Sequence, residues 1–227
     1  MKAISGALAE LDISPMGIGA WAWGDRVFWG YGRGYNDADL QSAFSISLQA
    51  GINWFDTAEI YGSGRSERLL GQFLRHTEHE VIIATKFFPY PYRVWPGTVV
   101  RALCKSLKRL GLDQVGLYQI HWPAPPIPIS TLVSGLAEVV ERGLAKTVGV
   151  SNYNLKQTKL AYRVLAERGI SLACNQVQYS LLHHQPEHNG LLHTCHELGI
   201  TLVAYSPLGM GMLTGKYTPH NPPSGWR

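Results

Sequence analysis

Four side chains that can carry or stabilise a proton follow one another along the chain: Asp56, Tyr61, Lys86 and His121. A tyrosine can act as a proton donor if its pKa, normally about 10, is lowered, and a nearby ammonium such as that of Lys86 is expected to lower it. Asp56 is expected to pair with Lys86 and keep it charged. Together, these groups could protonate the oxyanion that forms when hydride reaches a carbonyl carbon, with His121 orienting the carbonyl.

The elements that must position these residues alternate between short apolar runs and longer amphipathic stretches, with a unit of about 30 residues. This pattern is typical of successive βα units in a parallel sheet. We expect strands at 15–21, 52–58, 81–87, 115–122, 146–152, 173–180 and 201–207. We expect helices at 37–50, 65–76, 98–110, 130–142, 155–168 and 187–198. Glycines in left-handed conformation are expected to end several of these helices, at Gly51, Gly111, Gly143, Gly169 and Gly199.

Polar side chains stand at the C-terminal end of six successive predicted strands. They are Asp56, Lys86, His121, Ser151 with Asn152, Gln176 with Gln178, and Tyr205 with Ser206. The carboxyl ends of the strands of a βα barrel converge on one face. We therefore expect these groups to share one polar site at the mouth of a barrel.

Composition limits the classes of partner. The chain has 227 residues, 45% of them hydrophobic, which suits one domain over residues 1–227. Its net charge of +4 comes from scattered Lys and Arg, so nucleic-acid binding is not expected. No run approaches the roughly 20 apolar residues of a membrane span. Three unevenly spaced cysteines and a poor N-terminal signal sequence predict a cytoplasmic location, and the oligomeric state stays open.

Two other patterns invite functional interpretations. The histidines at 183–196 lack the Cys or acidic partners of a zinc site, and Pro186 interrupts their helical register, so no metal is expected. The Gly-rich stretch 22–36 contains GYGRGY without a complete dinucleotide-binding fingerprint, and it is predicted to be a mobile loop near a substrate.

A lysine on a barrel strand could also form a Schiff base, so an aldolase remains an alternative.

Six motifs resemble those of the aldo-keto reductase superfamily in order and spacing. They are FDTAEIYGSGRSERLLG, ATKF, LYQIHWP, KTVGVSNYN, NQVQYSLL and YSPLGMGMLTGKY, and the resemblance runs from about residue 15 to the end. The chain looks most like plant and cyanobacterial plastid-type members and the pyridoxal reductase group. The resemblance implies a (β/α)₈ TIM barrel and NADPH-dependent reduction of a small carbonyl substrate.

The same resemblance implies the roles of individual residues. Tyr61 would be the general acid, Asp56 and Lys86 its tuning pair, and His121 the residue that orients the substrate. The related potassium-channel β subunits commonly carry Asn in place of this His, so His121 favours an enzyme. Trp21 and Trp23 would line the substrate pocket. The implied contacts of NADPH are Trp21, Asp56, Ser151, Asn152, Gln176, Tyr205, Ser206, Pro207, Leu208, Gly209, Gly211 and Lys216.

The C-terminal end carries a further expectation. By the resemblance, the sequence stops in the loop after strand seven, so the barrel is predicted to be truncated there. Strand eight and the basic residues that the family uses for the 2′-phosphate would be absent. An alternative to the reductase is therefore a truncated, non-catalytic remnant or a regulatory nicotinamide-binding protein.

Overall fold

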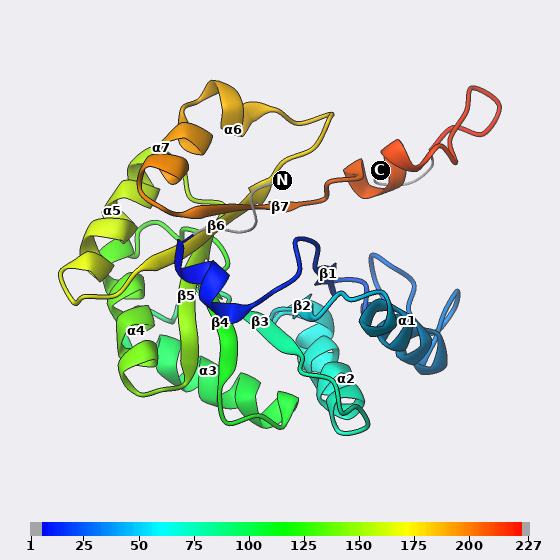
Figure 1. Cartoon of the computed structure of the whole chain (residues 1–227), viewed down its shortest axis with the longest axis horizontal. Helices are drawn as coiled ribbons and strands as arrows, with labels where there is room; N and C mark the ends of the chain where they lie inside the picture. The colour runs from blue at the N-terminus through cyan, green and yellow to red at the C-terminus, as the bar shows by residue number, and fades with distance from the viewer. Residues whose placement is uncertain (1–5, 224–227) are drawn as a thin grey trace.

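A computed structural model of the chain describes residues 6–223. Seven parallel strands form one sheet in which each strand pairs with the next along the sequence (Figure 1). The strands are β1 (Ile18–Gly19), β2 (Trp54–Asp56), β3 (Ile82–Phe87), β4 (Val115–Ile120), β5 (Ala145–Ser151), β6 (Leu172–Gln178) and β7 (Thr201–Tyr205). All seven predicted strands are confirmed, and within residues 6–223 the edges of the sheet are β1 and β7.

Helices connect successive strands and lie on the outside of the sheet (Figure 1). They are α1 (Asp37–Gln49), α2 (Arg65–Leu74), α3 (Gly97–Leu110), α4 (Ile129–Glu141), α5 (Leu155–Ala166), α6 (Gln185–His188) and α7 (Leu191–Glu197). The single helix predicted at 187–198 is wrong. Gly190 has φ 79° and separates α6 from α7.

Local sequence explains where the helices begin and end. Asn154 caps α5 by accepting from the backbone N–H of Gln157, whose side chain in turn accepts from the N–H of Asn154. Helix α3 buries one face through Val99, Leu103 and Leu107, and it ends at Gly111 with φ 70°. The other four predicted glycine ends also have positive φ. The crossover helices are therefore fixed largely by short-range signals.

Two apolar clusters fill the two sides of the sheet. The larger cluster lies between the strands and the outer helices. The smaller one lies on the inner face, where the 3₁₀ helix η1 (Gly6–Leu11) packs against β5 and β6 and contributes Leu8 and Leu11. Side chains alternate between the faces of a strand, so the apolar residues of this inner cluster determine which later residues also point inward.

This alternation places the polar groups. In β3, Ile82 and Ala84 belong to the inner cluster, so Lys86 points inward two residues later. In β4, Leu117 is followed on the same face by Gln119. In these two strands the inward face is apolar at its lower end and polar near the carboxyl end, where the sequence analysis expected polar groups.

Candidate active site

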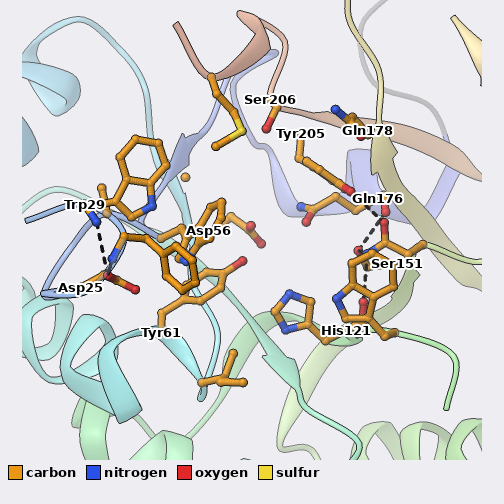
Figure 2. Close-up of a pocket in the computed structure, with 18 residues that line it drawn as sticks. Asp25, Trp29, Asp56, Tyr61, His121, Ser151, Gln176, Gln178, Tyr205 and Ser206 are labelled. Atoms are coloured by element: carbon orange, nitrogen blue, oxygen red, sulfur yellow. Dashed lines mark hydrogen bonds between the residues drawn. The ribbon is translucent and has the colours of Figure 1, made fainter. Parts of the chain in front are cut away.

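A pocket of about 680 Å³ opens at the carboxyl ends of the strands (Figure 2). Most of the predicted site residues line it: Trp21, Asp56, Tyr61, His121, Ser151, Asn152, Gln176, Gln178, Tyr205 and Ser206. Lys86 lies beneath them and is only 1% exposed. The six strand ends that the sequence singled out therefore converge on one site.

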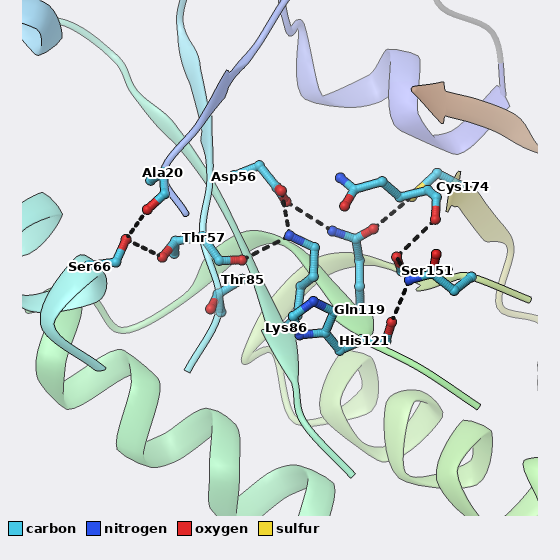
Figure 3. A network of polar contacts seen from close by, with 12 residues as sticks. Ala20, Asp56, Thr57, Ser66, Thr85, Lys86, Gln119, His121, Ser151 and Cys174 are labelled. Carbon is cyan, nitrogen blue, oxygen red and sulfur yellow. Dashed lines mark hydrogen bonds and ion pairs between the residues drawn. The ribbon is translucent and has the colours of Figure 1, made fainter. Parts of the chain in front are cut away.

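Lys86 is held by the last residue of β2 and the residue that follows it (Figure 3). Its Nζ contacts the carboxylate of Asp56 and donates to the backbone carbonyl of Thr57 at 3.0 Å. Burial disfavours the ammonium, but the charges of Asp56 and Tyr61 and hydrogen bonding to both raise the pKa of Lys86 above its ordinary value. Lys86 is therefore charged at neutral pH, as expected from the pair with Asp56.

A residue that the sequence analysis did not single out orients Asp56. Gln119 is fully buried, and its Nε2 donates to Asp56 Oδ1 at 3.2 Å. The thiol of Cys174 donates to Gln119 Oε1 at 3.6 Å (Figure 3). An added Cβ at Gly149 would lie 2.5 Å from the sulfur of Cys174, so glycine leaves room for this chain of contacts. The inward alternation of β4 was the signal that could have identified Gln119.

Tyr61 lies beside this pair, with Lys86 Nζ 5.4 Å from the centroid of its ring. The predicted lowering of its pKa is wrong: the pKa of Tyr61 is raised. Burial raises it most, while the charge of Lys86 and hydrogen bonding to Lys86 lower it and the charge of Asp56 raises it. Desolvation of the phenolate outweighs the nearby ammonium, so Tyr61 carries its proton at neutral pH.

His121 faces the same space. Its ring lies edge-on to Tyr61 with centroids 5.6 Å apart, and Phe88 lies 5.8 Å away on another side. Burial and the charge of Lys86 lower the pKa of His121 to about 3. No described residue bonds to its Nδ1. His121 is thus a neutral imidazole that can offer an N–H to a bound molecule.

The loop of Tyr61 is pressed against the loop that follows β1. Tyr61 begins the 3₁₀ helix η2 (Tyr61–Gly64), and an added Cβ at Gly62 would lie 2.7 Å from the carbonyl oxygen of Gly24. Only glycine tolerates this approach together with its φ of 53°. The contact places the Tyr61 ring 6.3 Å from that of Trp21.

A second group of polar side chains forms the opposite wall. Ser151 donates to the carbonyl of Gln176 at 2.8 Å, and Asn152 Nδ2 donates to the carbonyl of His121 at 3.1 Å. The hydroxyl of Tyr205 donates to Asn152 Oδ1 at 3.0 Å. Asn152 has φ 60°, which turns the backbone at the end of β5. The wall therefore presents fixed hydrogen-bonding groups beside an aromatic ring.

The remaining predicted contacts lie in the segment after β7, which extends away from the sheet (Figure 1). Ser206 has φ 52°, and the segment continues into the 3₁₀ helix η3 (Gly209–Thr214). Ser206 and Met210 line the pocket. Other predicted contacts in this segment are not among the lining residues: Pro207, Leu208, Gly209, Gly211 and Lys216. Their role in holding phosphate stays a prediction.

The aromatic part of the pocket differs from the prediction at one position. Trp21, Phe28, Trp29 and Trp122 line it. Trp23 was expected beside them, but it is 5% exposed and packs between Phe55 and Phe73 in the outer core. Within residues 6–223, no group of His, Cys, Asp or Glu is arranged to hold a metal, and no helix is long and apolar enough to cross a membrane.

Comparison with known proteins identifies the family of the chain. Residues 15–226 match the model of the aldo/keto reductase family. The chain is 46% identical to a chloroplastic pyridoxal reductase of Arabidopsis thaliana, over 97% of this chain and 64% of the relative. It is 35% identical to L-glyceraldehyde 3-phosphate reductase of Escherichia coli K12, over 79% of this chain and 54% of the relative. It thus spans less than two thirds of the length of these relatives.

Solved structures show the same fold. A thermostable aldo-keto reductase in complex with the inhibitor epalrestat is 33% identical, with a TM-score of 0.76 over 90% of this chain and 72% of that one. An aldo/keto reductase of Klebsiella pneumoniae in complex with NADP and acetate is 26% identical, with a TM-score of 0.73 over 89% and 68% of the two chains. The motifs, the seven-stranded parallel sheet and these matches lead to one conclusion: the chain belongs to the aldo/keto reductase family.

Proposed function

We propose that the chain forms the catalytic centre of an NADPH-dependent reductase that converts an aldehyde or ketone to an alcohol, with Tyr61 as the proton donor. The observation that carries the proposal is the buried ammonium of Lys86, which contacts Asp56 beneath the pocket and lies 5.4 Å from the ring of Tyr61. A charge buried so deeply is costly unless it is paired and hydrogen-bonded, which Asp56 and the carbonyl of Thr57 provide here. Its neighbours here are a phenol and a neutral imidazole that face the pocket.

The opposite wall fits the nicotinamide end of the cofactor. A carboxamide needs both donors and acceptors, and Ser151, Asn152 and Gln176 supply them from fixed positions. Tyr205 would offer an aromatic surface to the planar ring. The Klebsiella relative crystallised with NADP supports the same choice of cofactor. When bound, the cofactor supplies the hydride.

The side chains of this protein account for the rest of the reaction. The neutral His121 donates an N–H to the carbonyl oxygen and holds the carbonyl in the pocket. Tyr61, which keeps its proton at neutral pH because its pKa is raised, donates that proton to the oxygen as negative charge develops there. Lys86 stabilises the phenolate that remains, and Asp56 keeps Lys86 charged.

The same electrostatics disfavour the aldolase alternative. Formation of a Schiff base requires a neutral amine at Lys86, whereas Asp56 and Tyr61 raise its pKa. Lys86 also lies beneath the residues that line the pocket. Treatment with borohydride and a carbonyl substrate is therefore expected to give no Lys86 adduct. An adduct at this position would overturn the reductase proposal.

The central test is the variant Tyr61→Phe. It removes the phenolic hydroxyl and keeps the ring, so we expect carbonyl-dependent oxidation of NADPH to fall at least about 100-fold while the affinity for NADPH changes little. Turnover is followed at the near-ultraviolet band of NADPH, and affinity is followed by tryptophan fluorescence. Tyr90→Phe removes a hydroxyl outside the pocket and serves as the control. Most of the turnover surviving in Tyr61→Phe would contradict the assignment.

The location of the protein also stays a proposal. The cytoplasm is supported by the cysteine content, and Cys104, Cys174 and Cys195 are all free thiols. The Arabidopsis relative is named as a chloroplastic protein. A fluorescent fusion of the full gene product would distinguish the two compartments.

A further inference from the structure

The pocket contains a carboxylate that the proposed reaction does not use. Asp25 lies in the loop after β1, lines the pocket and is only 9% exposed (Figure 2). Its Oδ1 accepts from the backbone N–H groups of Val27 at 2.9 Å, Phe28 at 2.7 Å and Trp29 at 3.4 Å. No described residue donates to its Oδ2. One oxygen therefore organises the loop, and the second has no hydrogen-bond donor among residues 6–223.

Among the described residues, no side chain of opposite charge pairs with Asp25. The described residues that line the pocket include two carboxylates, Asp25 and Asp56, and neither Lys nor Arg. Asp56 is paired with Lys86 beneath the pocket, whereas Asp25 belongs to no ion pair of the described residues. The adjacent Arg26 is exposed. The pocket wall thus carries one carboxylate that no described side chain neutralises by an ion pair.

Aromatic rings line the same pocket as Asp25. Trp21 lies 5.4 Å from Trp29, edge to face, and 6.0 Å from Phe28 between ring centroids. Trp21 also reaches the ring of Tyr61, so this aromatic group adjoins the proposed proton donor. Faces of tryptophan and phenylalanine attract organic cations, and a buried carboxylate strengthens that attraction.

We infer that the pocket selects carbonyl compounds that carry a positively charged nitrogen on an aromatic or apolar body, with Asp25 as the residue that recognises the cation. This inference rests on the proposed reductase function, because it specifies the class of substrate. The carbonyl group lies between Tyr61 and His121, and the cation lies against Asp25 and the ring of Trp21. A neutral substrate of the same shape removes water from Asp25 without supplying an opposite charge.

The structure also suggests a variant that separates recognition from loop stability. In Asp25→Asn, the side-chain oxygen can still accept from the three backbone N–H groups, but the negative charge is gone. Asp113→Asn removes one negative charge at an exposed position outside the pocket and serves as the matched control. Thermal melts of both variants check that the fold is retained.

The experiment compares two aldehydes of nearly equal shape, 4-(trimethylammonio)benzaldehyde and 4-tert-butylbenzaldehyde, with NADPH as reductant. For the wild-type protein, we expect kcat/KM to be at least about 10-fold higher for the cation, mainly through a lower KM. The ammonium group also withdraws electrons from the carbonyl whatever the protein, so the readout is the change in this ratio: Asp25→Asn should lower it at least about 10-fold, mainly through a higher KM for the cation, whereas Asp113→Asn should preserve it. The inference is wrong if the wild-type protein does not prefer the cation, or if Asp25→Asn leaves the ratio unchanged.

A binding measurement separates this inference from the proposed function. Phenyltrimethylammonium and tert-butylbenzene carry no carbonyl, and their binding can be followed by calorimetry for the wild-type protein and for Asp25→Asn. Reduction of neither aldehyde would count against the proposed function. A preference for the ammonium compound that is lost in Asp25→Asn would still support the cation site. Equal binding of both compounds by the wild-type protein would overturn it.

Discussion

Acidification should destabilise the protein through His121. Burial and Lys86 lower the pKa of this imidazole from 6.5 to about 3 in the folded protein, whereas the unfolded chain regains the ordinary value. Between these two values the unfolded state binds more protons than the folded state, so stability falls as the pH falls below 6.5. The perturbation is a change from about pH 7 to about pH 5.

The size of the effect follows from the two pKa values. At about pH 5, the imidazole of His121 is mostly protonated in the unfolded chain and neutral in the folded protein. The free energy of unfolding is therefore about 2 kcal/mol lower at about pH 5 than at about pH 7 through this residue alone. This free-energy difference depends mainly on the pKa of His121 in the unfolded chain. Raising the folded pKa by about one unit changes it by less than about 0.1 kcal/mol.

The assay is urea denaturation at the two pH values for the wild-type protein and for His121→Asn. The variant lacks the imidazole, so its unfolding free energy should fall by about 2 kcal/mol less than that of the wild-type protein. His193→Asn, at an exposed position of α7, controls for the loss of a histidine in general. Equal losses in the wild-type protein and His121→Asn would refute the idea that His121 is neutral in the folded state.

Three further predictions concern neighbouring groups. Gln119→Met removes the hydrogen bond to Asp56 and should lower the unfolding free energy by about 1.5–3 kcal/mol, measured by urea denaturation, and should also reduce kcat. Glu67 is fully buried, accepts from Thr85 and pairs with Arg109, so Glu67→Ala should cost about 3 kcal/mol in the same assay; a cost below about 0.5 kcal/mol would contradict this. Because the pKa of Tyr61 is raised, kcat/KM for reduction should stay constant from neutral to mildly alkaline pH and fall only when the phenol ionises; a fall near neutral pH would argue against Tyr61 as the donor.

Much of the fold and of the site could be predicted because both depend on local periodicity. Residues two apart in a strand share a face, so Lys86 follows Ile82 and Ala84 inward, and its position at the strand end places it beneath the pocket. Left-handed glycines such as Gly111 mark where helices end. These signals operate within a few residues and are visible in the sequence.

The parts that were missed or wrong depend on the environment that the fold creates. Trp21 and Trp23 differ by two residues, yet one lines the pocket and the other lies in the outer core, because the loop after β1 does not keep the alternation of a strand. The pKa of Tyr61 depends on the balance between burial and the charge of Lys86, which residue types alone do not give. Asp25 was not identified from the sequence, because it lies in a Gly-rich stretch that was predicted to be a mobile loop.

The left-handed backbone at the pocket constrains which substitutions can accumulate there during evolution. Asn152, Ser206 and Met210 all line the pocket with positive φ, a conformation that costs a residue with a side chain on the order of 1–3 kcal/mol. Selection for thermal resistance alone would favour glycine at these positions and would erase the side chains that shape the cavity. Substitutions that raise thermal stability without altering the pocket are therefore expected in the outer helices. The pocket keeps its left-handed residues at a cost in the free energy of unfolding.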